Sequence, residues 1–537
     1  MATRGPGRST RNGAGRIRRT RPRARVIVKK DAMGPTHDLV KTGVSGLDVL
    51  LGDGIPRGNI ILLEGSIGVG KTTLGVEFVY RGAHQFNEPG IIVLFEISPD
   101  RLIRDAANLG WDLRALQAAR TLKIIYTTRQ VFAQELQQTD SLLLEEAATL
   151  RARRIFVDGI AGRPGGVDHS EEGLDTFYRL AEGLQRQHLT AVLAVEATAF
   201  RDEPRVALPE ESVADTVIRL RLEVATRTTV RSLEIVKSRG HAFQMGRHSF
   251  QIVDGCGVQV YRRVQAPRLP SREEAAPLDG ATRITTGVPG LDVLVNGGYL
   301  LGSTTVNVGV SGVGKSVMGL QYLAEGMRLG QRSVMISLDE PIPQIIRNAT
   351  TIGIDLQDGI DRDLVRVQYG SPQELEIDRH FSQLEQLVEA FQPTRVLFDS
   401  LSTYGASLGT TGGIFRDFFH ALVALMKEHQ IVTVYNHENP EMLGMASMMG
   451  DFSMSSLVDN ILLMNWIELG DTFRLALTVA KMRGNPNQRV THECEIVNGH
   501  GLHVLPRVIP APMLEPFSRY RNLISRNPER RLDARLT

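Results

Sequence analysis

The feature that most constrains this 537-residue chain is a glycine-rich octapeptide that occurs twice. It reads GSIGVGKT from Gly65 to Thr72 and GVSGVGKS from Gly309 to Ser316, and both copies fit the pattern G-x-x-x-x-G-K-[ST]. The lysines of the two copies, Lys71 and Lys315, are 244 residues apart. Other landmarks repeat at the same offset, so the chain is predicted to be a duplicated nucleotide-binding protein.

Each fixed position of this pattern has a physical reason. Glycines let the backbone N–H groups approach a triphosphate closely. The lysine brings a positive charge to the β- and γ-phosphates, the next hydroxyl is a ligand for Mg2+, and the helix that begins there directs its positive end at the anion. We therefore predict ATP and Mg2+ as cofactors. The predicted ATP-binding residues of the two loops are Gly65, Gly68, Val69, Gly70, Lys71, Thr72 and Thr73, and Gly309, Ser311, Gly312, Val313, Gly314, Lys315, Ser316 and Val317.

The sequence around both loops predicts the order strand, loop, helix. Residues 59–64 and 304–308 are short apolar segments, typical of buried strands, and amphipathic helices are predicted from Leu74 and from Val317 onward. The predicted fold class is therefore α/β, with a mostly parallel twisted sheet flanked by helices in each half.

Two further motifs repeat at the 244-residue offset. Thr42–Leu50 reads TGVSGLDVL and Thr286–Leu294 reads TGVPGLDVL, with eight of nine positions identical, and residues 237–240 (KSRG) correspond to residues 481–484 (KMRG). A period this long indicates a tandem domain duplication and not a solenoid. The proline-containing segment 265–279 is the predicted linker. The predicted organisation is a basic arm at 1–36, domains at 37–264 and 280–506, and a tail at 507–537.

Each half also contains an apolar segment that ends in aspartate. These segments are residues 154–158 and 395–399, which end in Asp158 and Asp399. A buried strand that presents a carboxylate at its carboxyl end is what a P-loop enzyme uses to hold Mg2+. The predicted metal ligands are Thr72, Asp158, Ser316, Asp339 and Asp399.

A second set of carboxylates lies between the P-loop helix and that strand. Glu96 ends one apolar segment, and Asp339 and Glu340 end its counterpart. Such a carboxylate can polarise the water that attacks the γ-phosphate or accept a hydroxyl proton during phosphotransfer, so all three are predicted catalytic residues. The alternative is a helix cap or a first-turn acid, because Pro99 and Pro341 follow closely.

The charge of the chain is unevenly distributed. The net charge is +2, but residues 1–30 contain 11 basic residues and no acidic one. This arm is predicted to be disordered, and its contacts could be with nucleic acid, anionic lipid or an acidic partner, or with solvent alone. An Arg-rich, acid-poor start is also the composition of an organelle transit peptide. The Arg-rich tail after residue 507 is interpreted as a solvated segment.

Other features of the composition favour a cytoplasmic protein. No apolar run approaches the ~20 residues of a membrane span, and no signal-peptide pattern is present. The only cysteines, Cys256 and Cys494, are too few for a disulfide framework and have no metal-ligand spacing, which fits a reducing compartment.

With these motifs in place, the chain resembles the KaiC family of ATPases and autokinases, which have two RecA-like domains. The resemblance covers about residues 37 to 505. RecA and RadA recombinases share the G-x-x-G-L-D motif but lack the tandem arrangement. The resemblance implies a homohexameric double ring with ATP at the subunit interfaces, where the K-x-R-G motif reaches the neighbour's phosphates. The residues that match this motif are Lys237, Arg239, Lys481, Met482 and Arg483, and a solvated β-hairpin is the alternative interpretation.

The resemblance also implies different roles for the two halves. The family presents two adjacent glutamates at the catalytic strand tip, whereas this chain has Glu96 followed by Ile97. The family's phosphoacceptor pair, usually Ser then Thr, falls at Ser455 and Ser456, which would otherwise be interpreted as ordinary turn residues. Hydrolysis is thus expected in the first domain, and serine autophosphorylation in the second, where Asp339 is one carbon shorter than glutamate.

Two other functions fit the same motifs. The chain could be a DNA-dependent ATPase of the recombinase or helicase kind, although nucleic acid is not expected to bind outside the basic arm. It could also be a nucleotide-gated hexameric scaffold with negligible turnover. A regulatory or response-regulator-type protein is an expected partner in signalling or clock-related regulation. No membrane association is expected, and the tail does not indicate a KaiA-type partner.

Overall fold

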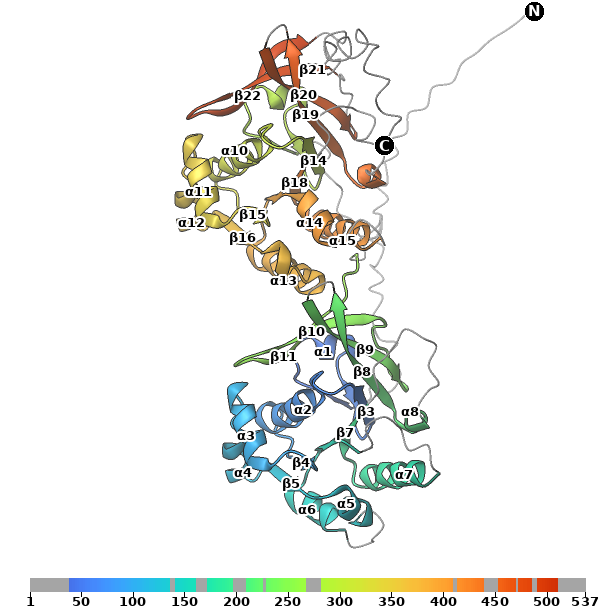
Figure 1. The fold of residues 1–537 in the computed structure, drawn as a ribbon. Coiled ribbons are helices and arrows are strands. Elements are labelled where there is room, and N and C mark those ends of the chain that lie inside the picture. The colour runs from blue at the N-terminus through green and yellow to red at the C-terminus, as the bar shows by residue number, and fades with distance from the viewer. Residues whose placement is uncertain are drawn as a thin grey trace, which may run out of the picture.

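The computed structural model shows two similar α/β units that follow each other along the chain, which confirms the predicted fold class (Figure 1). The residues that it describes are 38–135, 141–160, 171–196, 209–225, 228–266, 282–408, 413–438, 453–469, 472–484 and 490–509. The predicted arm at 1–36, all but the first two residues of the predicted linker, and the predicted tail after residue 509 lie outside these described residues.

The first half comprises residues 38–266. Its elements, in chain order, are β1 (Leu39–Val40), α1 (Leu47–Leu50), β2 (Ile55–Pro56), β3 (Ile60–Gly65), α2 (Lys71–Gln85), β4 (Gly90–Leu94), α3 (Pro99–Asn108), α4 (Leu113–Ala118), β5 (Leu122–Tyr126), α5 (Arg129–Glu135), α6 (Leu142–Leu150), β6 (Arg154–Asp158), α7 (Glu171–Arg186), β7 (Thr190–Glu196), α8 (Pro209–Val213), β8 (Thr216–Ala225), β9 (Thr228–Ser238), β10 (Arg247–Val253) and β11 (Gly257–Tyr261).

The second half comprises residues 282–509. Its elements are β12 (Arg283–Ile284), α9 (Leu291–Leu294), β13 (Tyr299–Leu300), β14 (Thr304–Gly309), α10 (Lys315–Arg328), β15 (Ser333–Ser337), α11 (Ile342–Thr351), α12 (Leu356–Asp361), β16 (Val365–Tyr369), η1 (Pro372–Glu374), α13 (Ile377–Phe391), β17 (Arg395–Asp399), α14 (Leu401–Leu408), α15 (Ile414–Glu428), β18 (Val432–Glu438), η3 (Ser453–Ser456), β19 (Asn460–Leu469), β20 (Thr472–Met482), β21 (Thr491–Val497) and β22 (Gly501–Ile509).

Each half is built around one nine-stranded sheet with the same topology. The strand orders are β11-β10-β9-β8-β3-β7-β6-β4-β5 and β16-β15-β17-β18-β14-β19-β20-β21-β22. Six strands of each sheet are parallel, and the last three continue it through antiparallel pairs. The carboxyl ends of the parallel strands therefore meet at one edge, where an open α/β sheet binds its ligand.

The central strand of each sheet is buried on both faces. In β3, Ile61 and Leu63 belong to the core cluster that contains Val79 of α2, whereas Ile60 and Leu62 belong to the cluster that contains Leu180 of α7. Successive residues of a strand point to opposite faces, so a continuous apolar run predicts a strand covered on both sides. Helices lie on both faces of the sheet as a result (Figure 1).

The two halves meet through α13 of the second half and the β10–β11 hairpin of the first (Figure 1). The carboxylate of Asp378, near the start of α13, accepts hydrogen bonds from the backbone N–H groups of Ser249 (3.3 Å) and Val264 (3.0 Å). The Gln251 amide donates to Glu376 at 2.6 Å. This contact is mainly polar, and Val264 of the first half also packs against a hydrophobic core cluster of the second.

Most predicted elements are confirmed, with shifts at their ends. The predicted strands at 154–158 and 395–399 have the bounds of β6 and β17. Both P-loop helices begin at the loop lysine, three and two residues before the predicted starts. The strands that precede the catalytic acids end at Leu94 and Ser337, so Glu96 and Asp339 lie in the turns beyond them.

Two predictions from composition can be compared with the structure. In the part of the chain that the structure describes, no helix is long and apolar enough to cross a membrane. Both cysteines are free thiols: Cys494 is buried in the second half and Cys256 is exposed on a turn of the first.

Candidate nucleotide-binding and catalytic sites

In each half, the glycine-rich loop connects the central strand to the following helix. Gly68 (φ 78°) and Gly70 (φ 113°) adopt left-handed conformations that side chains beyond glycine rarely take, and Gly312 and Gly314 do the same in the second loop. Val69 and its counterpart Val313 are fully buried and anchor the loops to the core. The remaining loop backbone is left to face a phosphate, which is the arrangement that the motif predicts.

The loop lysines lie over the loops from which they arise. The Lys71 Nζ donates to the carbonyl oxygens of Gly65 (2.8 Å) and Ser66 (2.9 Å). The Lys315 Nζ donates to those of Gly309 (2.8 Å) and Val310 (2.7 Å). Burial lowers the pKa of both lysines, and nearby carboxylates oppose this shift. A bound phosphate would supply the countercharge that such a buried ammonium group needs.

The predicted Mg2+ ligands are adjacent in both halves. The hydroxyl of Thr72 donates to Asp158 at 2.8 Å, at the carboxyl end of β6. Ser316 makes the equivalent side-chain bond to Asp399, and burial raises the pKa of both aspartates. Hydroxyl and carboxylate oxygens are ligands that Mg2+ accepts together with substrate phosphates. Among the described residues, no group of three or more His, Cys, Asp or Glu is placed to hold a metal ion.

The predicted catalytic acid of the first half, Glu96, is held by an arginine. The Arg129 guanidinium, at the start of α5, makes a 2.6 Å ion pair with Glu96 and donates through Nε to the carbonyl of Gly159 at 2.7 Å. Gly159 directly follows Asp158, a predicted Mg2+ ligand, so Arg129 connects Glu96 to the strand end that carries this aspartate. The helix-cap interpretation does not describe Glu96, because α3 begins at Pro99 with Ser98 as its N-cap residue.

The first predicted catalytic acid of the second half, Asp339, is held by hydroxyl groups. Asp339 accepts hydrogen bonds from Ser400 (2.8 Å) and Thr403 (2.6 Å), and Ser400 directly follows Asp399. Ser400 thus connects Asp339 to the strand end that carries Asp399, and both aspartates are predicted metal ligands. The carboxylate of Glu340 accepts instead from the Asn348 amide of α11 at 2.9 Å, on a different element.

The K-x-R-G motifs lie at the opposite end of each sheet from the P-loop. The backbone N–H of Arg239 donates to the Asp215 carbonyl, and the Asp215 carboxylate accepts from the N–H of Ile60, the first residue of β3. The P-loop follows the last residue of the same strand. Six residues of strand separate these ends by roughly 20 Å, so Arg239 does not reach its own loop.

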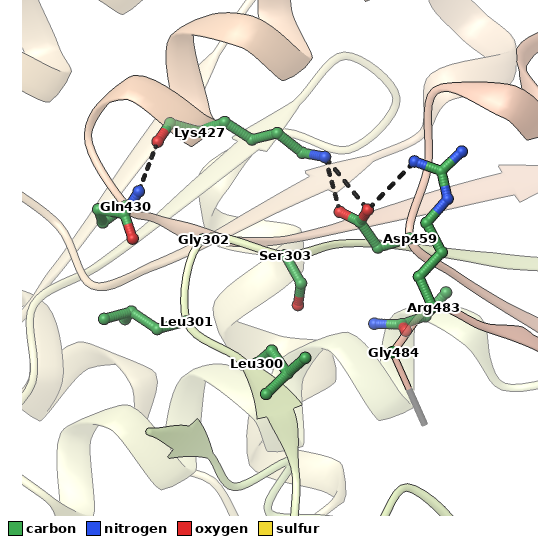
Figure 2. Close-up of a pocket in the computed structure, with 10 residues that line it drawn as sticks. Leu300, Leu301, Gly302, Ser303, Lys427, Gln430, Asp459, Arg483 and Gly484 are labelled. Atoms are coloured by element: carbon green, nitrogen blue, oxygen red, sulfur yellow. Dashed lines mark hydrogen bonds and ion pairs between the residues drawn. The ribbon is translucent and has the colours of Figure 1, made fainter. Parts of the chain in front are cut away.

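The second half repeats this geometry around a pocket of about 450 Å3 (Figure 2). Asp459 accepts from the N–H of Thr304, the first residue of β14, and pairs with Lys427 (2.9 Å) and Arg483 (3.6 Å). The side chain of Met482 is buried in the core cluster, so only its backbone is available to a ligand.

The predicted phosphoacceptors lie beside this basic motif. Ser455 and Ser456 are in η3, and Ser456 is exposed. The Lys481 Nζ donates to the carbonyls of Ser455 and Val458, the latter at 2.7 Å, and Arg483 donates to the carbonyl of Ser456. In the first half, Lys237 makes the equivalent bonds to Glu211 and Ala214, both at 2.7 Å, and Arg239 donates to Ser212. The serines therefore also lie at the sheet end remote from their own P-loop.

Sequence reasoning missed four residues that the structure brings to these sites. Arg129, Ser400 and Thr403 hold the predicted catalytic acids, and Lys427 pairs with Asp459. None belongs to a repeated motif. The only available signal was position, since Ser400 directly follows the predicted metal aspartate.

The fold and the two loops define the class of this protein, a P-loop nucleotide-binding protein with two copies of the loop. The family model described as ATPase: KaiC matches residues 40–265 and 284–508, so the chain belongs to the KaiC family of ATPases, as its motifs predicted.

Curated relatives agree with this assignment. The chain is 28% identical over 498 residues to the circadian clock oscillator protein KaiC of Picosynechococcus sp. strain PCC 7002, covering 91% of this chain and 92% of the relative. It is 28% identical over 497 residues to circadian clock oscillator protein KaiC 1 of Synechocystis sp. strain PCC 6803, with the same coverage of each chain. The likeness thus spans both halves.

Proposed function

We propose that this chain is a Mg2+-dependent ATPase whose first half hydrolyses ATP and whose second half phosphorylates Ser455 or Ser456 of a neighbouring copy. One observation carries the proposal: each K-x-R-G motif, and the serine pair with it, lies at the end of the sheet remote from its own P-loop. A basic motif and a P-loop can therefore act on one nucleotide only between two chains. This arrangement supports a ring, and we propose a homohexamer with ATP at the subunit interfaces.

In the first half, Glu96 acts as the general base for hydrolysis. The water oxygen bonds to the γ-phosphorus, the bond from that phosphorus to the β–γ bridging oxygen breaks, and the water proton passes to the Glu96 carboxylate. Lys71 and the neighbour's Lys237 and Arg239 stabilise the negative charge on the transferring group. Mg2+, held by Thr72 and Asp158, would neutralise charge on the β- and γ-phosphates.

In the second half, a serine hydroxyl of the neighbouring chain replaces the water. The Oγ of Ser455 or Ser456 bonds to the γ-phosphorus, ADP leaves, and the hydroxyl proton passes to Asp339. Lys481 and Arg483 bind the carbonyls of these serines, so the acceptor and the basic motif enter the neighbour's site together. Glu340 is assigned to the same site, with Ser316 and Asp399 as ligands of Mg2+.

The names of the relatives extend this proposal to regulation. They are described as circadian clock oscillator proteins, and we infer a signalling or clock-related role in the cytoplasm, with a regulatory or response-regulator-type protein as partner. The proposed domain limits are 37–264 and 280–506, with the remaining segments as arm, linker and tail.

The proposal is tested by complementation between two inactive chains. A Lys315→Ala chain retains the serines but loses the second P-loop lysine, and a Ser455→Ala/Ser456→Ala chain retains the loop but loses the acceptors. Mixed, reassembled and incubated with γ-labelled ATP, the Lys315→Ala chain, marked by an affinity tag, should become labelled. Label confined to a wild-type control, and absent from every mixture, would contradict transfer between chains.

The same preparations separate the alternative functions. Lys71→Ala and Lys315→Ala should each lower ATP turnover, and the double variant should abolish it. Assembly that needs ATP while the parent chain shows no turnover would indicate a scaffold. Turnover that rises with single-stranded DNA at low salt, and falls after deletion of residues 1–30, would indicate a DNA-dependent motor.

A further inference from the structure

We propose that Arg129 is the positioning residue for Glu96 in the first half, and that Gly159 is glycine because it makes room for Arg129. This inference rests on the proposed role of Glu96 as the base for hydrolysis. It concerns a residue that belongs to none of the repeated motifs.

The Arg129 guanidinium is held on three sides. One NH2 group contacts Glu96 Oε1 at 2.6 Å, Nε donates to the Gly159 carbonyl at 2.7 Å, and the guanidinium carbon lies 5.5 Å from the centre of the Phe95 ring. A planar guanidinium with several fixed donors restricts the rotation of the group it binds more than a single ammonium contact does. Arg129 thus connects the acid to the strand end that carries Asp158.

Glu96 needs such support because its side chain is exposed and has no adjacent carboxylate. Its side chain is 72% exposed, and its neighbour Ile97 packs against the hydrophobic core and offers no second carboxylate. A free glutamate on the surface samples several rotamers, and only some place its carboxylate next to the attacking water. Arg129 engages Oε1, and we assign Oε2 to the proton of the water.

In the second half, the corresponding acid Asp339 is held by different residues. The N–H of Thr127 donates to Leu94, and the N–H of Gly370 donates to the corresponding Ser337. This register places Pro372 of η1 where the first half has Arg129 of α5. A proline cannot form the ion pair, and there Asp339 is held by Ser400 and Thr403.

Gly159 explains why the arginine fits in the first half alone. Ser400 occupies the corresponding position, directly after the Mg2+ aspartate, and its hydroxyl contacts the acid. A Cβ built on Gly159 would lie 3.1 Å from the Arg129 NH2 group, and its φ of 89° disfavours a side chain. A serine at position 159 would therefore push against Arg129. The acid that follows this strand is therefore held in two alternative ways: by Arg129 beside Gly159 in the first half, and by Ser400 and Thr403 in the second.

The size of the effects on stability and on rate distinguishes a positioning role of Arg129 from a structural one. Exposed ion pairs contribute only about 0–1 kcal/mol to folding, so loss of this pair should barely change stability. A displacement of about 1 Å in a catalytic group can lower the rate about 100-fold. A large effect on turnover with an unchanged unfolding midpoint is thus the signature of a positioning residue.

The experiment measures steady-state ATP hydrolysis in full-length Lys315→Ala protein, where the first half supplies the turnover. Arg129→Gln should lower kcat about 30- to 100-fold with KM changed less than about threefold. Arg129→Lys should recover part of kcat. Added guanidinium ion should raise kcat of Arg129→Ala, but not of Glu96→Gln. Gly159→Ser should lower kcat, and added guanidinium ion should not restore it. The matched control Arg104→Gln, at an exposed position of α3, should have the kcat of the parent protein.

The following results would contradict the positioning role of Arg129. An unchanged kcat in Arg129→Gln, or a higher KM with the same kcat, would show that Arg129 does not act through Glu96. An unfolding midpoint that falls in Arg129→Gln and recovers in Arg129→Lys along with kcat would assign it a structural role. If Lys71→Ala and Glu96→Gln leave turnover unchanged, the proposed function itself fails; if both lower it while the Arg129 variants do not, only the positioning role fails.

Discussion

Glu96 and Asp339 follow corresponding strands of the two sheets, yet one is bound by a guanidinium group and the other by two hydroxyl groups. The loop lysines, by contrast, bind equivalent pairs of carbonyls in both halves. Phosphate binding depends on backbone geometry that tolerates little change, whereas an acid at a strand tip can be held by any well-placed donor. The two halves therefore keep equivalent contacts at the loop lysines but differ in the donors that hold the two predicted catalytic acids.

The largest expected effects come from removing these acids one at a time. A general base contributes about 10²- to 10⁴-fold to the rate. Glu96→Gln should lower phosphate release by that factor and leave phosphoserine formation unaffected, whereas Asp339→Asn should do the opposite. Phosphate release and phosphopeptide mass spectrometry on the same samples measure both. Equal losses of both activities in either variant would contradict the division of labour.

The buried arginines of the two sheets offer a second comparison. Arg154, at the start of β6, makes a 2.6 Å ion pair with Glu88, whereas its counterpart Arg395 donates through Nε to the Gln331 amide at 2.8 Å. Glu88→Gln would replace this ion pair by a neutral amide contact like that of the second half, and it would also remove the 2.8 Å ion pair between Glu88 and Arg57. Breaking a buried pair on one side costs about 3–5 kcal/mol, so the free energy of unfolding of the first half should fall by about 3 kcal/mol.

The two tryptophans make this measurement specific, because each half contains one. Trp111 is buried in the first half and Trp466 lies on β19 of the second. In a Trp466→Phe background, denaturant unfolding followed by fluorescence reports on Trp111 alone. The matched control is Gln331→Ala followed through Trp466, which should cost no more than about 1–3 kcal/mol. Equal losses of unfolding free energy in Glu88→Gln and Gln331→Ala would show that the charge of the Glu88 carboxylate does not add to stability.

Acid should destabilise the second half through His380 of α13. Burial lowers the pKa of His380 to about 4 from an ordinary value of 6.5, and its ring contacts the Tyr404 hydroxyl at 2.7 Å. The unfolded chain binds a proton as pH falls through 6.5, but the folded chain does not until pH 4, so stability is lost within this window. The loss at pH 5 is about 2 kcal/mol relative to neutral pH.

This effect is measured as the difference between wild type and His380→Gln, which keeps a polar group beside Tyr404 but cannot take up a proton. The stability gap between the two should change by about 2 kcal/mol from neutral pH to pH 5, seen through Trp466. A gap that stays constant across this range would show that His380 does not remain neutral in the folded state.

The smallest expected effect concerns the pocket of Figure 2. Lys427 pairs with Asp459 in this pocket. The corresponding residue of the first half is Gln185, because the carbonyl of each accepts a hydrogen bond from the backbone N–H three residues later. Lys427→Gln would remove the ion pair. Such pairs near the surface contribute about 0–1 kcal/mol, so the free energy of unfolding reported by Trp466 should fall by no more than about 1 kcal/mol. A larger loss would mean that Lys427 fixes the start of β14 through Asp459.

Much of the fold followed from local patterns. The strands that end in Asp158 and Asp399 were predicted with the correct bounds, because a short apolar run with a polar end is decided by its own residues. The ends of the strands before Glu96 and Asp339 were placed too late, because the turns there contain residues that could also extend a strand. The loops were recognisable because their glycines and lysine are constrained by phosphate geometry.

The sequence by itself determined the duplication, the two glycine-rich loops, the strands that end in Asp158 and Asp399, and the family. Those features consist of residues close together in the chain, or of the same motif repeated at one offset. Only the tertiary structure decided that Arg129 binds Glu96 across 33 positions, that Ser400 binds Asp339 across 61, and that each basic motif lies at the end of the sheet remote from its own loop. These contacts join segments through the order of strands in the sheet, and nothing in the intervening residues encodes that order locally.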